Sequence, residues 1–132
     1  SNSYTVMPSL QGAPTAYTFQ ISFQAEQAGK AWAVAVLKSA AASMSVAQMM
    51  SGAGTICNLQ AVVVAAGANT LSLAGCDFDT MNRYAALVYV ANANGGDDGA
   101  LSPVVELALP PSNTFEEDLL LPSLPNSDGV TA

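Results

Sequence analysis

The feature that most constrains the fold is a regular alternation of apolar and polar side chains. Within residues 16–24 single polar residues separate the large apolar ones, which are Tyr17, Phe19, Ile21 and Phe23. A repeat of two residues is that of a β-strand with one buried face. The segment therefore predicts a strand whose apolar face, Tyr17 included, contributes to a core.

The same alternation continues further along the chain. Trp32, Val34 and Val36 share one face of a strand over residues 31–37, and small side chains occupy most of the other. We expect this strand to be central, covered on one side and lightly packed on the other. Other β-rich runs, separated by Gly- and Asn-bearing breaks, lie at 4–10, 59–65, 70–73, 84–90 and 101–109.

One segment has a different pattern. Residues 43–51 contain helix formers after a Ser43 or Ser45 that can act as N-cap, and Gly52 can end a short helix. About seven short strands and one helical connector predict an all-β chain, an antiparallel two-sheet β-sandwich of the immunoglobulin or fibronectin type III kind. A closed barrel is the alternative.

Composition excludes several classes of function. The 132 residues suit a single domain, and 51% apolar content is enough for a core. Ten acidic residues against three basic ones give a net charge of −7, which excludes nucleic acid as a partner. No apolar run reaches the ~18 residues that span a bilayer, so no membrane insertion is expected.

Histidine is absent from the sequence. This removes the usual general base and the commonest zinc ligand. Asp77 and Asp79 resemble a glycosidase pair, but Asp is equally typical of a turn after a strand, and nothing marks a cleft around them. Serine nucleophiles lack an evident activator beyond Lys30 and Lys38. We therefore expect no catalytic residue and no enzyme activity.

The two cysteines predict a disulfide. If Ala66-Gly67 is the centre of a hairpin, Cys57 lies directly opposite Cys76, at a separation close to what a disulfide requires. Two unrelated buried thiols are the alternative. A Cys57–Cys76 bridge implies an oxidising compartment, and hence a secreted protein in an extracellular or cell-surface location.

A short sequence pattern occurs twice. Ser1-Asn2-Ser3-Tyr4 recurs as Ser112-Asn113-Thr114-Phe115, and Pro8-Ser9-Leu10 recurs as Pro122-Ser123-Leu124 after a three-residue lengthening. The offset of 111 residues is the size of one sandwich domain, so residues 1–111 are predicted to be one repeat and 112–132 the start of the next. The absence of an initiator Met also suggests a mature or excised segment.

The segment 112–132 is acidic and apolar at once. It carries four acidic residues and no basic one, and it is too short to fold alone. Its apolar side chains predict docking on a sheet edge or groove, of this domain or of a neighbouring copy: Phe115, Leu119, Leu120, Leu121 and Leu124. Docking on a neighbour is strand addition and makes these residues an inter-subunit joint.

Several short blocks resemble a known kind of repeat. Gly29-Lys30-Ala31-Trp32-Ala33, Leu73-Ala74-Gly75-Cys76, Tyr84 leading into Leu87-Val88-Tyr89-Val90, Asp98-Gly99-Ala100-Leu101-Ser102 and the junction at 112–115 are similar to the repeat unit of large secreted structural proteins of algal protists such as dinoflagellates. Those proteins consist of fibronectin type III-like or immunoglobulin-like domains. The resemblance implies a surface or extracellular structural role without catalytic residues. It also places Tyr84 where these sandwiches have a tyrosine corner, with an ordinary core tyrosine as the alternative.

A Gly-rich loop offers the candidate metal ligands. Asn92, Asn94, Asp97 and Asp98 carry oxygen atoms at a spacing that can hold Ca²⁺, although the bidentate Glu of a helix-loop-helix calcium site is missing. A plain hairpin loop is the alternative, and no other cofactor is expected. Tyr17, Trp32, Tyr84 and Tyr89 lie on predicted strands and can form a sugar-binding platform, although core packing suits Trp32 better.

Two functions therefore follow from the sequence. The first is a non-catalytic extracellular structural repeat whose partners are copies of itself or adjacent repeats of the same chain. Such repeats join end to end into a filament, surface appendage or matrix. The alternative is an adhesion or carbohydrate-binding module that holds glycans, with Ca²⁺ in the loop from Asn92 to Gly99.

Overall fold

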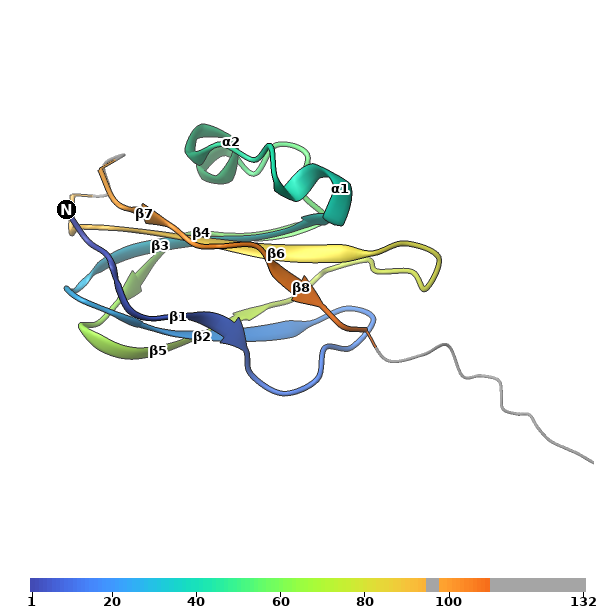
Figure 1. Cartoon of the computed structure of the whole chain (residues 1–132), viewed down its shortest axis with the longest axis horizontal. Coiled ribbons are helices and arrows are strands. Elements are labelled where there is room, and N and C mark those ends of the chain that lie inside the picture. The colour runs from blue at the N-terminus through green and yellow to red at the C-terminus, as the bar shows by residue number, and fades with distance from the viewer. Residues whose placement is uncertain (95–97, 110–132) are drawn as a thin grey trace, which may run out of the picture.

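The computed structural model describes residues 1–94 and 98–109 and shows two antiparallel β-sheets packed face to face (Figure 1). The first sheet has the order β1-β2-β5, formed by Tyr4–Leu10, Phe19–Ala25 and Gly67–Leu73. The second has the order β4-β3-β6-β7, formed by Cys57–Val64, Gly29–Leu37, Tyr84–Ala91 and Ala100–Leu101, and β8 (Val105–Leu107) also pairs with β6. The all-β sandwich is thus confirmed, with eight strands where about seven were expected.

The helical connector also forms as predicted. Helix α2 (Val46–Ser51) begins at Ser45, whose hydroxyl accepts a hydrogen bond from the Gln48 amide while the Gln48 side chain accepts one from the Ser45 amide. This reciprocal pair is a capping box. The helix ends at Gly52, which adopts a positive φ of 74°. An additional helical turn, α1 (Lys38–Ala41), follows β3 directly.

The main core lies between the two sheets. Strand β2 contributes Phe19, Ile21 and Phe23, as its alternation predicts. Tyr17 does not join them and is 64% exposed, because β2 begins only at Phe19. Thr15 closes a turn around Tyr17 by accepting hydrogen bonds from the amides of residues 17 and 18.

Strand β3 is central, as expected, but both of its faces are covered. The small side chains of Ala31, Ala33 and Ala35 face the first sheet, where they leave room for the aromatic side chains of β2. The opposite face, with Trp32, is buried beneath α1 and α2 in a second apolar cluster that includes Val34, Val36 and Met49. Figure 1 shows the two helices above this outer face. The expectation of one lightly packed face was therefore wrong.

The predicted strand over 101–109 is divided in two at Pro103, which has no amide hydrogen to donate. Ser102 compensates at this interruption. Its buried hydroxyl accepts a hydrogen bond from the Val88 amide at 2.9 Å, and its own amide donates to the Val88 carbonyl at 2.8 Å. The strand β8 that follows leads the chain out at the end of the sandwich opposite the N-terminus (Figure 1).

Candidate functional site

The disulfide is present, but it connects different elements from those expected. The Cα atoms of Cys57 and Cys76 are 4.9 Å apart, and both residues are buried. Strand β4 pairs with β3, where Cys57 lies opposite Ala35. Strand β5 pairs instead with β2, in the other sheet. The predicted hairpin between β4 and β5 was therefore wrong. The chain crosses between the sheets at residues 65 and 66, and the disulfide links the first residue of β4 to the segment that follows β5.

The predicted inter-subunit joint lies outside the described residues. This applies to Phe115, Leu119, Leu120, Leu121 and Leu124, and to the predicted boundary at 111–112. The structure describes the sandwich through Leu109 and shows the arrangement of residues 1–4, where the recurring sequence pattern first occurs.

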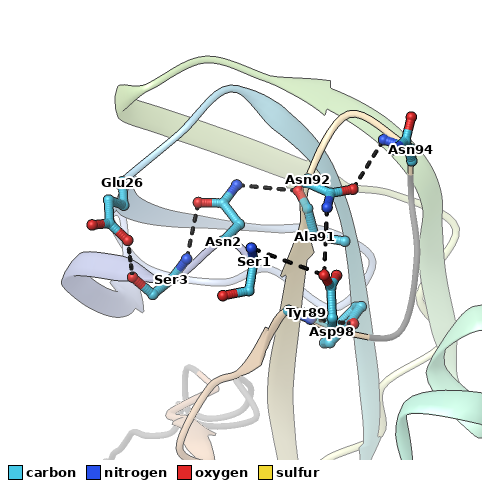
Figure 2. A network of polar contacts seen from close by, with 10 residues as sticks. Ser1, Asn2, Ser3, Glu26, Tyr89, Ala91, Asn92, Asn94 and Asp98 are labelled. Atoms are coloured by element: carbon cyan, nitrogen blue, oxygen red, sulfur yellow. Dashed lines mark hydrogen bonds and ion pairs between the residues drawn. The ribbon is translucent and has the colours of Figure 1, made fainter.

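Asn2 is the residue of that pattern with the most specific role. It is 2% exposed, and its side-chain nitrogen donates to the carbonyls of Gln27 at 2.8 Å and Ala91 at 3.1 Å. Its side-chain oxygen accepts from the amides of Ser3 and Gln27. Every hydrogen-bonding position of the amide group is thus used. We call this set of four hydrogen bonds the Asn2 clamp; Figure 2 shows the side chain reaching toward Ala91.

The Asn2 clamp joins three parts of the chain that are distant in sequence. It ties the N-terminus to the turn between β2 and β3 and to the last residue of β6. Ser3 extends the connection by donating a 2.7 Å hydrogen bond to Glu26. Sequence reasoning missed this function of Asn2, although the recurrence of the pattern at Asn113 was a signal that the residue matters.

Tyr4 is the second anchor of β1. Its ring meets Phe23 edge to face at 5.6 Å between ring centroids, and its hydroxyl donates to the Val88 carbonyl at 2.8 Å. Burial raises the pKa of Tyr4 well above its ordinary value, with a smaller contribution from Tyr89. Tyr4 therefore remains a hydrogen-bond donor over the physiological pH range.

The middle of β1, after Tyr4, is held loosely. It is an edge strand, its pairing with β2 contains two register shifts between Tyr4 and Ser9, and four of its seven residues are exposed. Val6 and Met7 are 50% and 57% exposed. Within β1, only Tyr4, Pro8 and Leu10 therefore bury much side-chain surface; Asn2 is anchored just before the strand.

Tyr84 is the first residue of β6 and is buried. Its hydroxyl accepts a 3.1 Å hydrogen bond from the Asp79 amide, five residues upstream, and its ring packs on Phe78. This is the geometry that defines a tyrosine corner. The Asp79 carboxylate accepts hydrogen bonds from the Met81 amide and the Asn82 side chain, so it stabilises the turn that precedes β6.

Three of the candidate metal ligands, Asn92, Asn94 and Asp98, lie among the described residues and are linked by hydrogen bonds. The side-chain oxygen of Asn92 accepts from the Asn94 amide, and its side-chain nitrogen faces Asp98 at 3.5 Å (Figure 2). Asp98 also lies 3.9 Å from the terminal amine of Ser1. Asp97 is outside the described residues, among which no group of three His, Cys, Asp or Glu side chains that could hold a metal ion occurs. The calcium site therefore stays a prediction.

The aromatic residues do not form a sugar-binding platform. Trp32, Tyr84 and Tyr89 are 6%, 2% and 1% exposed, and only Tyr17 of the four is accessible. Trp32 packs against Tyr89 beneath the helices. Core packing, the function considered better suited to Trp32, is what the structure shows. Glycan binding stays a prediction without these three rings as its surface.

Two of the three basic residues lie close to where the described chain ends. Lys38 and Arg83 flank Glu106 of β8, at 3.0 and 3.9 Å. The hydrogen bond from Lys38, and then the charges of Lys38 and Arg83, lower the pKa of Glu106. All three side chains are well exposed, so this network adds little to stability.

Comparison with known proteins adds no further assignment. No family model matches the chain, and no similar curated protein or solved structure was found. Among the helices of residues 1–94 and 98–109, none is long and apolar enough to cross a membrane. The class that the structure defines is a disulfide-linked, two-sheet antiparallel β-sandwich.

Proposed function

We propose that the chain is a non-catalytic extracellular structural repeat that associates end to end into a filament, surface appendage or matrix, with residues 112–132 as the joint. The observation that carries this proposal is the position of the two ends of the sandwich. The N-terminus and the end of β8 lie at opposite ends of the molecule in Figure 1. An end-to-end array needs this arrangement, because each module must receive the chain at one end and release it at the other.

The length of β6 supports the assignment of the tail to another module. Asn2 binds to Ala91, the last residue of β6, whereas Leu107 pairs with Tyr84, the first. Seven residue steps along a strand separate these points by about 23 Å. Asn113 lies six residue steps beyond Leu107, which span at most about 20–22 Å when fully extended. Strand β8 runs antiparallel to β6, so the chain passes Leu107 in the direction away from Ala91. Asn113 could reach the Asn2 clamp of its own chain only if the chain reversed directly after Leu107 and stayed almost fully extended, which favours a clamp in another module.

Other features agree with this proposal. The disulfide is compatible with an extracellular location and resists unfolding of the module. The fold agrees with the resemblance to fibronectin type III-like or immunoglobulin-like repeats of secreted algal proteins, which we propose as its family. Strand β4 pairs with β3, whereas an immunoglobulin constant domain places the fourth strand in the sheet of the first two. We therefore favour the fibronectin type III-like assignment.

The experiment is sedimentation velocity of the full chain over a range of concentrations. We expect reversible association that is lost when Leu119, Leu120 and Leu121 are all replaced by Ser. The matched control replaces Val63 and Met81 by Ser, because these side chains are 80% and 89% exposed on the described sandwich. A chain that stays monomeric at every concentration, or that loses association only in the control, contradicts the proposal.

A further inference from the structure

The contacts of β1 identify where a tail can bind. We propose that residues 112–124 of one copy occupy the β1 position of a second copy, pairing with β2 in place of residues 2–10. This inference rests on the proposed function and names the surface that the joint uses. The partner is a second copy of this chain, and the contact is an exchange of edge strands.

The tail repeats the side chains by which β1 is anchored. Strand β1 is held through Asn2, Tyr4, Pro8 and Leu10, which make the clamp, the contact with Phe23 and the buried contacts at its far end. The tail carries the corresponding residues in the same order: Asn113, Phe115, Pro122 and Leu124. The exposed middle of β1 requires no particular side chains, and in this stretch the sequence of the tail differs from that of β1.

Phe115 differs from Tyr4 only by its missing hydroxyl. In the described module this hydroxyl donates to the Val88 carbonyl, which also accepts a 2.8 Å hydrogen bond from the Ser102 amide. The carbonyl therefore keeps a partner when Phe replaces Tyr, and no buried acceptor is left unsatisfied. The edge-to-face contact with Phe23 requires only the ring.

The three-residue lengthening of the tail falls where β1 tolerates it. Insertion of an odd number of residues moves the following side chains to the other face of a strand unless a bulge absorbs it. Strand β1 already contains both of its register shifts between Tyr4 and Ser9, the stretch that corresponds to the insertion. The two anchored ends can therefore be matched while the middle accommodates additional chain.

The tail of a chain is poorly placed to use its own β1 position in this register. The six steps from Leu107 to Asn113 span slightly less than the seven steps of β6 that separate Leu107 from the clamp, and the chain passes Leu107 in the opposite direction. These limits favour an occupant from another copy. Since β1 is an edge strand, its displacement opens the core only at Tyr4, Pro8 and Leu10, the positions that Phe115, Pro122 and Leu124 of the tail would fill.

Disulfide trapping between two full-length variants tests this register. Ser9 pairs with Ser22 of β2, and Ser123 holds the position in the tail that corresponds to Ser9. Chains with Ser22→Cys are mixed with chains with Ser123→Cys in a thiol redox buffer, and the linked peptides are identified by mass. We expect a heterodimer linked through residues 22 and 123. The control acceptor carries Ser51→Cys, exposed at the end of α2.

Weakening the resident strand makes the test sharper. Asn2→Ala in the acceptor removes the clamp and should raise the linked fraction roughly tenfold. Tyr4→Phe is a milder second acceptor that should fold normally and also raise it. In the donor, Asn113→Ala should lower the linked fraction, whereas Asn126→Ala, a tail asparagine outside the repeated pattern, should leave it unchanged.

The outcomes separate this inference from the proposed function. The β1 exchange is overturned if the linked fraction in both the Asn2→Ala and the Tyr4→Phe acceptors is no greater than with the Ser51→Cys acceptor. Linkage that is insensitive to Asn113→Ala overturns it as well. If the full chain still associates through its leucines in either case, the end-to-end function stands and a different surface receives the tail.

Discussion

Removing the disulfide between Cys57 and Cys76 should destabilise the module by an amount that follows from the loop it closes. The two residues are 19 positions apart. The chain-entropy relation then gives a loss of about 3 kcal/mol on replacing both by Ala. For a domain of this size the melting temperature should fall by roughly 10–20 °C. The bridge links the start of β4 to the segment after β5, so its loss also frees the crossing between these two strands.

The assay is urea unfolding of the full chain and of the double variant, followed by tryptophan fluorescence of the buried Trp32. The double variant avoids a single unpaired thiol, which would exchange or dimerise. A matched control is the oxidised protein compared with its own reduced form, which should show a similar loss. A difference in unfolding free energy below about 0.5 kcal/mol would refute the reasoning, because the loop would then contribute almost none of its closure entropy.

Three other substitutions test parts of the structure independently. Met49→Ala should cost about 2–5 kcal/mol of unfolding free energy by opening a cavity under α2, whereas Met81→Ala, at an 89% exposed side chain, should change it by less than about 0.5. Burial raises the pKa of Tyr4, so above about pH 10 the unfolded state releases the hydroxyl proton while the folded state holds it, and the free energy of unfolding should fall as pH rises. Tyr4→Phe should flatten that decline, measured by urea unfolding at pH 9 and 11. Lys38 lowers the pKa of Glu106, so the small stabilising effect of this contact is present above the ordinary pKa of Glu and is lost as pH falls through the lowered pKa. Lys38→Gln should raise the pKa of Glu106 in carbon-detected NMR titrations. An unchanged pKa would contradict the contact.

The sequence predicts local structure well where one residue pattern determines it. The alternation around Phe19 places β2 and its buried face, since a strand exposes its sides in a repeat of two. Ser45 and Gly52 mark the ends of α2, because their side chain and backbone satisfy groups that the helix leaves unpaired. These features depend only on neighbours in the chain.

The partners of each strand were harder to predict. Nothing in the pattern of β4 indicates that it pairs with β3 while β5 joins the other sheet, so the pairing of the cysteines was correct although the hairpin that suggested it was wrong. The faces of β3 were misread for a similar reason. The buried Trp32 face is covered by helices that the alternation does not reveal.

Asn2 shows a different limit of sequence reasoning. Asparagine is mostly an exposed residue, so its burial could not be expected from its type. The carbonyls that accept hydrogen bonds from its side chain belong to Gln27 and Ala91, and only the fold brings these residues close to the N-terminus. The repeated pattern gave the only indication, and it became interpretable once the Asn2 clamp was known.

End-to-end association through β1 requires residues 112–124 to become ordered when copies associate. Hydrogen–deuterium exchange of the full chain, measured at concentrations below and above the association range, tests this directly. We expect backbone amides of that segment to gain protection only in the associated state, with the amides of β1 exchanging faster as their position is contested. Rapid exchange of residues 112–124 under both conditions, in samples shown to be associated, would contradict the claim that this segment joins one module to the next.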